Sequence, residues 1–212
     1  MDAAWTSQAH QGGLFGADAA ALEPAGLAYL PDFLTRTEED DLMALLATLP
    51  LQNAAYKQYT ARRRVTSFGH SYDYDANVLR DAPAIPAAFD RVRARVAAWA
   101  GVEAADFAQL LVAEYAPGTP LGWHRDVPDY ELVAGVSLGT AATLRFRPYP
   151  HRPGTKSVLR DVEVAPRSVY SMRGPARWDW QHCVLPTPGH RFSLTFRTRS
   201  NRRMNAEPGF PA

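Results

Sequence analysis

Apolar and polar residues alternate with a period of two through most of the chain after residue 107. Side chains two residues apart point to the same side of an extended backbone, so this alternation predicts β-strands with one buried face. Glycine and proline residues separate the alternating runs, as is typical of the turns between strands. The predicted strands cover residues 108–115, 132–138, 142–147, 157–164, 167–172, 178–184 and 191–198.

The residues before this region follow helical spacing instead. A short strand beginning at Leu27 leads into a first helix, which Thr35 or Thr37 can cap and which Pro50 ends. The apolar stripe of this helix consists of Leu42, Leu45, Leu46 and Leu49. The acidic residues at 38–41 complement the helix dipole, and we interpret them as solvated surface.

A second helix is predicted over residues 85–100, with Pro86 in its first turn and Gly101 just after its end. Its apolar face consists of Phe89, Val92, Val96 and Trp99. The arginines at 91, 93 and 95 fall on its other faces, and we interpret them as charges exposed to solvent.

Helices followed by seven or eight strands predict an α+β protein that is mainly β. The expected architecture is a double-stranded β-helix (jelly-roll) core backed by the N-terminal helices. We expect a loose leader over residues 1–26, a single domain over 27–199 and a tail over 200–212. A chain of 212 residues is long enough to bury one substantial core.

The composition is that of a globular protein, with 46% hydrophobic and 11% aromatic residues. No apolar run approaches the length needed to cross a bilayer. Cys183 is the single cysteine, which excludes an intramolecular disulfide and favours a reducing compartment. We expect a cytoplasmic monomer that does not associate with membranes.

Charge is distributed unevenly along the chain. Residues 1–55 hold eight acidic and one basic side chain, whereas residues 56–212 hold fourteen acidic and twenty-two basic ones. A basic body favours binding of phosphate groups. A second interpretation stays open, because some arginines can serve a cofactor or pair with acids, and a GC-rich genome also favours arginine.

The pair His124 and Asp126 is the first candidate for metal chemistry. In an extended segment these two side chains share a face and can grip one ion. Such a tripeptide arises often by chance, but His182 follows in another strand-like run. Two histidines and one carboxylate with open positions form the usual set for a non-haem Fe(II) oxygenase.

The last predicted strand places Leu194 and Phe196 on one face and polar residues on the other. The polar face carries Arg191, Ser193, Thr195 and Arg197. A guanidinium binds a carboxylate through two parallel hydrogen bonds, so this face is suited to hold an anion.

Together these segments resemble the AlkB family of Fe(II)/2-oxoglutarate dioxygenases. The resemblance rests on Tyr115-Ala116-Pro117-Gly118, His124-x-Asp126, His182 and Arg191-x5-Arg197, in that order. It covers roughly residues 60–199, most of the chain.

The resemblance implies that His124, Asp126 and His182 bind Fe(II), with 2-oxoglutarate as cosubstrate and O₂ as oxidant. It places the far carboxylate of 2-oxoglutarate on Arg191, with Tyr115 donating a hydrogen bond, Ser193 between the arginines and Arg197 near the metal. No catalytic residue beyond the metal ligands is implied. The implied reaction hydroxylates or demethylates an alkylated DNA or RNA base and releases N-methyl groups as formaldehyde.

In this family the region corresponding to residues 56–80 supplies a lid over the substrate. The lid candidates for substrate contact are Phe68, Tyr72, Tyr74, Arg62, Arg63 and Arg64, where basic and aromatic residues are interleaved. An ordinary strand pair with exposed arginines is an equally weighted interpretation. Several relatives that repair bases carry an acid two residues after the metal aspartate. Here that position is Pro128, and Asp129 is the candidate to replace the missing acid.

Several alternatives therefore remain open at this stage. The chain can be a dioxygenase acting on a protein or a small molecule, or a nucleic-acid-binding module without turnover on the same scaffold. A structural zinc site or a hydrolase can use the same three ligands. The two arginines of the last strand argue against zinc alone, because a simple zinc site has no need of a dicarboxylate clamp.

Overall fold

A computed structural model describes residues 22–56, 59–154 and 158–201 of the chain. Residues 1–21 of the expected leader and 202–212 of the expected tail lie outside this range. In chain order the elements are β1 (Leu27–Leu30), α1 (Arg36–Leu46), β2 (Gln52–Tyr56), β3 (Tyr59–Phe68), β4 (His70–Asp73), β5 (Val78–Asp81), the 3₁₀ turn η1 (Ala87–Phe89), α2 (Asp90–Ala100), the 3₁₀ turn η2 (Ala104–Asp106), β6 (Phe107–Tyr115), β7 (Leu121–His124), β8 (Tyr130–Gly139), β9 (Ala142–Pro148), β10 (Arg160–Val164), β11 (Ser168–Met172), α3 (Gly174–Trp178), β12 (Trp180–Val184) and β13 (Arg191–Arg199).

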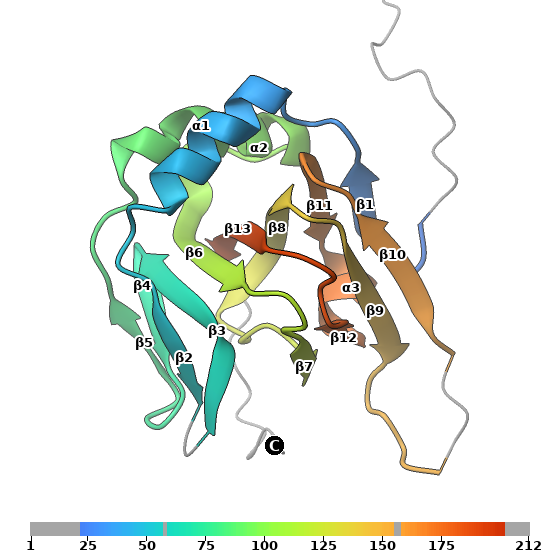
Figure 1. The fold of residues 1–212 in the computed structure, drawn as a ribbon. Coiled ribbons are helices and arrows are strands. Elements are labelled where there is room, and N and C mark those ends of the chain that lie inside the picture. Colours follow the sequence, from blue (N-terminus) through green and yellow to red (C-terminus); the bar gives the residue numbers. More distant parts are fainter. Residues whose placement is uncertain (1–21, 57–58, 155–157, 202–212) are drawn as a thin grey trace, which may run out of the picture.

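Two antiparallel sheets form the body of the protein (Figure 1). The major sheet has seven strands in the order β1-β11-β8-β13-β6-β3-β2, and the minor sheet has the order β10-β9-β12-β7. A buried cluster that includes Leu144 and Phe146 of β9 and Tyr170 and Met172 of β11 joins the two sheets. The strands β4 and β5 form a separate hairpin beside them. This arrangement confirms the predicted jelly-roll core.

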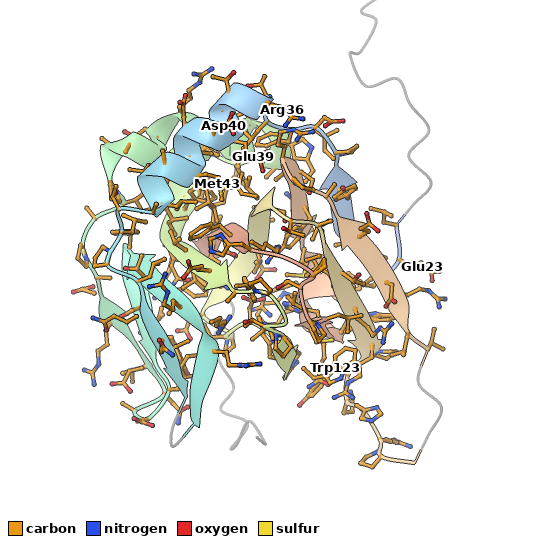
Figure 2. The ribbon with its side chains drawn as sticks, viewed as in Figure 1. Glu23, Arg36, Glu39, Asp40, Met43 and Trp123 are labelled. Carbon is orange, nitrogen blue, oxygen red and sulfur yellow. The ribbon has the colours of Figure 1, made fainter. Side chains whose placement is uncertain are left out.

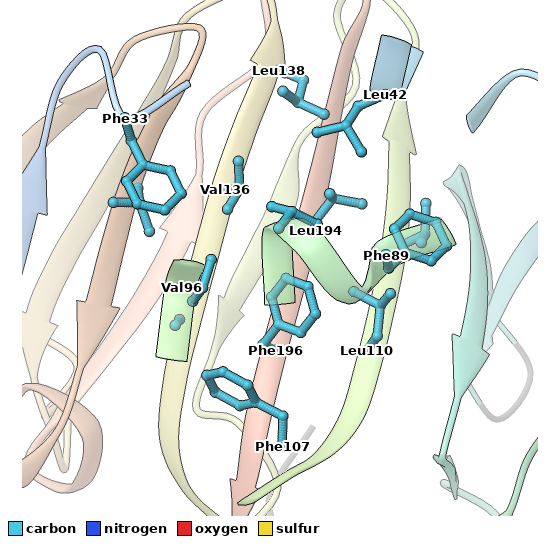
Figure 3. Packing of buried hydrophobic residues seen from close by; sticks show 14 of the residues in the cluster. Phe33, Leu42, Phe89, Val96, Phe107, Leu110, Val136, Leu138, Leu194 and Phe196 are labelled. Carbon is cyan, nitrogen blue, oxygen red and sulfur yellow. The ribbon is translucent and has the colours of Figure 1, made fainter. Parts of the chain in front are cut away.

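The helices α1 and α2 cover the other face of the major sheet, where the larger core lies (Figure 3). Thr35 caps α1: its hydroxyl accepts a hydrogen bond from the backbone N–H of Glu38, and Glu38 accepts one from the N–H of Thr35. Leu42 and Leu46 are buried against the sheet. The helix ends at Leu46, a turn earlier than predicted.

The interpretation of residues 38–41 as solvated surface is wrong for Glu39, which is buried (labelled on α1 in Figure 2). Its Oε1 accepts a hydrogen bond of 2.8 Å from the backbone N–H of Gly139, at the end of β8. Glu38 forms ion pairs with Arg91 and Arg95, so these two arginines connect α2 to α1.

The second predicted helix is present as a 3₁₀ turn followed by α2. Gly101 ends α2 with a positive φ of 69°, the left-handed conformation that glycine adopts without strain. Val92 and Val96 are buried in the core. None of the helices in the described residues is long and apolar enough to cross a membrane.

All seven predicted strands are present, but two of them begin clearly later than predicted: the strand predicted over 157–164 begins at Arg160 in the described residues. The strand predicted over 178–184 begins at Trp180, because Gly174–Trp178 forms the short helix α3 with Pro175 in its first turn. Five further strands, β2 to β5 and β7, form outside the predicted set.

The two faces of β13 separate the core from the candidate site. Phe192, Leu194 and Phe196 lie in the core under the helices. On the opposite face Arg191, Ser193 and Thr195 are also buried, between the two sheets. The alternation read from the sequence is therefore confirmed, and it points the polar residues of β13 into the jelly roll.

Candidate metal centre and cosubstrate site

His124, Asp126 and His182 come together where β7 meets β12. These strands are antiparallel, and His124 stands directly opposite His182, with ring centroids 4.2 Å apart. Asp126 follows two residues after His124, just beyond the end of β7. One ligand atom from each residue lies within 4.8 Å of the others, a spacing that one ion can bridge after small side-chain rotations.

The free lone pairs of these residues face one another. Nδ1 of His124 lies 2.8 Å from the carbonyl oxygen of Gly122, an acceptor that requires the proton on Nδ1 and leaves Nε2 free to bind a metal. Oδ2 of Asp126 is buried without a hydrogen-bond partner among the described residues, and it lies 3.7 Å from Nε2 of His182. An orphaned carboxylate oxygen beside two imidazoles fits a divalent cation such as Fe(II).

Electrostatics keep the site ready for a cation. Burial lowers the pKa of His182 to about 3, and burial also lowers the pKa of His124. Burial alone would raise the pKa of Asp126, but the charges of Arg197 and Arg177 oppose this effect, and the pKa lies well below its usual range. At neutral pH the site therefore presents two neutral imidazoles and one carboxylate.

Arg191 is a buried cation on the face of the major sheet that points toward the minor sheet. Its Nε donates a hydrogen bond of 3.1 Å to Oγ of Ser137, and its Cζ lies 5.0 Å from the ring centroid of Tyr115. Nη1 of Arg191 is buried, and no described residue accepts a hydrogen bond from it. A desolvated guanidinium donor without an acceptor fits a ligand carboxylate.

Small side chains cover the sheet between Arg191 and Arg197. Ser193 is aligned with Ser137 on β8 and with Ala113 on β6. Because directly opposed residues share a face of a sheet, these three form a shallow floor between the two arginines. This floor fits a short dicarboxylate such as 2-oxoglutarate.

Arg197 is occupied by protein acceptors, unlike Arg191. Its Nε and Nη2 donate to Oδ1 of Asp126 at 2.9 and 2.6 Å, and its Nη1 donates to Oε1 of Gln109. Nε2 of Gln109 in turn donates to the carbonyl of His70, at the start of β4. A chain of hydrogen bonds therefore connects Asp126 to the region expected to cover the substrate.

The lid candidates do not all lie together. Phe68 packs in the core with a ring centroid 6.1 Å from that of Phe89, so its assignment as a substrate contact is not supported. The strand alternation puts Phe68 on the helix-facing side of β3, where it pairs with Leu110. Tyr72 and Tyr74 are half-buried, and their rings meet edge to face at 4.9 Å.

The three consecutive arginines of β3 have different surroundings. Arg62 is exposed, and Arg64 forms an ion pair with Glu114. Arg63 is half-buried and points to the opposite side of the strand, and its charge contributes to the lowered pKa of His124. Its Nε is buried without a hydrogen-bond partner in the described part of the chain. Of the three, Arg63 has the surroundings of a ligand-binding residue.

Asp129 lies half-buried in the loop between Asp126 and β8. Its carbonyl accepts a hydrogen bond of 2.8 Å from the backbone N–H of Ser200. It adjoins Tyr130, whose pKa burial raises to about 12. These contacts give Asp129 no described role toward a substrate.

Sequence reasoning did not single out three polar residues that surround the site. Gln109 and Ser137 are polar residues in mainly apolar strands, a signal that a residue-by-residue reading of faces can detect. Arg177 is buried beside the loop that carries Asp126. It lies in a short helix between two predicted strands, a segment for which no element was predicted, so its direction could not be read from the sequence.

Comparison with known proteins gives a consistent picture. The sequence profile of the 2OG-Fe(II) oxygenase superfamily matches residues 26–197. The chain is 25% identical over 204 residues to a protein of Arabidopsis thaliana named "Alkylated DNA repair protein ALKBH8 homolog", covering 85% of this chain and 56% of that protein. It is also 25% identical over 169 residues to the mouse "tRNA (carboxymethyluridine(34)-5-O)-methyltransferase ALKBH8", covering 77% of this chain and 24% of the mouse protein.

The chain thus spans about half of the plant relative and a quarter of the mouse relative. Among solved structures, OsALKBH1 has a similar fold, with a TM-score of 0.62 at 18% identity. That match covers 82% of this chain and 97% of OsALKBH1.

Proposed function

This chain belongs to the 2OG-Fe(II) oxygenase superfamily and is AlkB-like within it, and from that premise we propose that it oxidatively demethylates or hydroxylates an alkylated nucleic-acid base. Fe(II), 2-oxoglutarate and O₂ are the cofactor and cosubstrates that the family implies. We assign the activity to a single domain over residues 27–199, with residues 56–80 as the substrate lid.

The observation that carries this proposal is the pairing of two unsatisfied groups between the sheets. The orphaned oxygen of Asp126 lies beside two imidazoles. The orphaned Nη1 of Arg191 lies on the face of the major sheet that points toward the minor sheet. A zinc site alone would leave the buried donor of Arg191 without an acceptor, at a cost of about 1–3 kcal/mol. Fe(II) held by the three ligands, together with a dicarboxylate held by Arg191, would satisfy both groups.

Bound Fe(II) supplies the oxidation of a C–H bond by O₂ at the expense of 2-oxoglutarate. The protein's own residues bind and orient. His124, Asp126 and His182 would hold the metal, Arg191 with Tyr115 would hold the far carboxylate, and Arg197 orients Asp126. Asp126 and His182 are buried, which would limit the contact of the reacting groups with water.

Several features support a nucleic acid as the substrate. The matched relatives carry names that refer to alkylated DNA repair and to tRNA. Arg63 brings an incompletely satisfied cation near the metal site, and Tyr72 and Tyr74 offer aromatic rings on the adjoining hairpin. Phosphate and stacking contacts are the usual means of holding a single strand. Pro128, where repair relatives carry an acid, favours recognition of a base by other groups.

The first test measures formation of the iron–2-oxoglutarate complex without oxygen and then turnover of candidate substrates with oxygen. Anaerobic addition of Fe(II) and 2-oxoglutarate should give the visible charge-transfer absorption of a 2-oxoglutarate–iron complex. Oxygen and a panel of N-methylated single-stranded DNA, RNA and tRNA are then added, and succinate and formaldehyde are measured. Formaldehyde that depends on one methylated nucleic acid is the expected result. Absorption with only slow, uncoupled succinate would direct the search to proteins or small molecules. Nucleic-acid binding without absorption or succinate would leave a non-catalytic binding module.

A matched pair of variants tests the nucleic-acid contact directly. Arg63→Gln should weaken oligonucleotide binding at every sequence and reduce the slope of log K against log salt by about 1. Arg62→Gln removes the same charge from an exposed neighbour and should change the slope much less. Equal effects of the two variants, or binding insensitive to salt, would contradict a phosphate contact at Arg63.

A further inference from the structure

The short helix α3 contacts the loop that carries Asp126. Arg177, in its last turn, has an exposed fraction of only 2%. Its Nη2 donates to the carbonyl of Val127 at 2.7 Å and to the carbonyl of Tyr130 at 2.9 Å. A single guanidinium nitrogen therefore holds two backbone groups of the loop that follows Asp126.

Two further hydrogen bonds join the same segments. Nε1 of Trp178 donates to Oε1 of Glu131 at 3.0 Å, and Nη1 of Arg125 donates to the carbonyl of Trp178 at 3.1 Å. The bonded residues of the loop lie on both sides of Asp126, because Arg125 precedes it and Val127, Tyr130 and Glu131 follow it. We call this set of contacts the α3 clasp.

The α3 clasp connects the chain segments that carry two of the metal ligands, Asp126 and His182. Asp126 lies between the end of β7 and the start of β8, where no ladder of strand hydrogen bonds fixes the backbone. His182 lies on β12, which begins two residues after the end of α3. The helix that holds the Asp126 loop thus leads directly into the strand that carries His182.

The chemistry of Arg177 is that of a backbone holder. No acidic side chain in the described ranges forms a salt bridge with it, and its Nε is buried without an acceptor there. Its cation lies against the ring of Trp178, with Cζ 4.3 Å from the ring centroid. A buried cation with only carbonyl acceptors costs stability, so a gain in stability does not explain why Arg177 is there.

We propose that Arg177 is a positioning residue of the metal centre: through the α3 clasp it fixes the Asp126 loop against the strand of His182 and so presets the distance between these two ligands. The inference rests on the metal site of the proposed function and requires nothing about the substrate. Residues outside the first ligand set that orient it typically change metal affinity by about 10- to 100-fold when they are replaced.

The test measures metal binding by folded protein without oxygen or substrate. Mn(II), a redox-stable substitute for Fe(II), is titrated into the protein, and the concentration of free Mn(II) is measured by electron paramagnetic resonance. Arg177→Met keeps the stem of the side chain and removes its donors, and it should weaken Mn(II) binding by about 10- to 100-fold. Arg177→Lys restores a cation that can reach one carbonyl and should recover part of the affinity.

Loss of stability alone must be separated from loss of position. Leu46→Ala serves as the control, because Leu46 is fully buried on α1 in the core that lies on the other face of the major sheet. It should lower Tm while the folded protein keeps wild-type Mn(II) affinity. Arg177→Met with wild-type affinity and only a lower Tm would overturn the proposal.

Three more outcomes bear on the proposal. If Arg177→Met does not fold, Trp178→Phe breaks the bond to Glu131 and keeps an aromatic ring, and it should weaken Mn(II) binding in the same direction; unchanged affinity in that variant would overturn the clasp. Wild-type protein that binds no Mn(II) would overturn the metal centre and the clasp together. Intact metal binding without any nucleic-acid turnover would leave the clasp standing and remove only the proposed substrate.

Discussion

Arg191 and Arg197 share one face of β13, but their surroundings give them different roles. Arg197 donates hydrogen bonds to Asp126 and Gln109, so it orients a protein carboxylate. Arg191 has only Ser137 as an acceptor, and its buried Nη1 has none within the described chain. The same residue type, six positions apart, therefore serves the protein in one case and is open to a ligand in the other.

Replacing Arg191 should impair binding of 2-oxoglutarate selectively. Hydrogen bonds to charged groups contribute about 1.5–3 kcal/mol, so Arg191→Met should raise the KM for 2-oxoglutarate by roughly 10- to 150-fold. Anaerobic titration of the visible absorption and steady-state succinate formation both report this change. Arg36→Met, at an exposed position on α1, is the control that should leave the KM unchanged. An unchanged KM in Arg191→Met would place the carboxylate elsewhere.

The buried histidines predict how the metal-free protein responds to acid. An unfolded histidine has a pKa of about 6.5, whereas folding lowers the pKa of His182 to about 3 and also lowers that of His124. Below pH 6.5 the unfolded state therefore binds more protons than the native state, and the free energy of unfolding falls as pH falls, by up to about 1.4 kcal/mol per pH unit for each histidine. Urea unfolding between pH 7 and 5 measures this slope. His182→Gln should have a shallower slope than the wild type, and an identical slope would contradict the assignment.

At the scale of elements, the sequence predicts the strands best where apolar and polar residues alternate regularly. The alternation in residues 191–198 identifies β13 and the side on which Arg191 and Ser193 lie. The method fails at α3, because five residues are too few for a helical period and the flanking runs are strand-like. Glu39 shows a second limit, since only the fold brings Gly139 to it. The metal ligands could be predicted from their residue types, whereas Arg177 acts through contacts that no local pattern contains.

The pairing of β8 with β11 depends on a glycine next to the cosubstrate floor. A Cβ added to Gly135 would lie 2.3 Å from Cζ of Tyr170, a buried ring on the paired strand. The charges of Arg191 and Asp126 reach the Tyr170 hydroxyl, so the ring borders the candidate site. A side chain at position 135 would therefore displace the Tyr170 ring within the space between the two sheets.

Gly135→Ala should therefore affect both stability and cosubstrate binding. Overpacking of a core costs about 1–3 kcal/mol, which calorimetry would record as a lower Tm. The displaced ring should also raise the KM for 2-oxoglutarate. The double variant Gly135→Ala with Tyr170→Leu removes the clash and should recover part of both losses. A Gly135→Ala variant with wild-type Tm and KM would show that the ring can move away without consequence.

At the scale of the whole molecule, the candidate site lies between the two sheets and takes ligands from both. His182 and His124 come from the minor sheet, and Arg191 comes from the major sheet. A metal together with 2-oxoglutarate should therefore hold the two sheets together. Ligands that bind only the native state stabilise it in proportion to their affinity.

Metal and cosubstrate should raise the thermal stability cooperatively. At a concentration 100 times the Kd the stabilisation is about 2.7 kcal/mol, which corresponds to an increase in Tm of roughly 5–10 °C for a domain of this size. Scanning calorimetry with Mn(II), with 2-oxoglutarate and with both measures it. His182→Ala should show no increase with Mn(II). The same increase in this variant and in the wild type would mean that the metal binds elsewhere.

The β2–β3 hairpin joins the molecule at one edge of the major sheet. Of the strands in that sheet, β3 pairs only with β6 and β2, while the strands with the candidate ligands continue on the other side of β6. An ion pair between Arg64 and Glu114 fastens this junction. Under the proposed function, Arg63 on this hairpin and the metal ligands thus lie on separate segments of the chain. Replacement of the hairpin by that of a relative would alter the phosphate contact while the three metal ligands stay in place, which offers protein engineers a route to altered specificity.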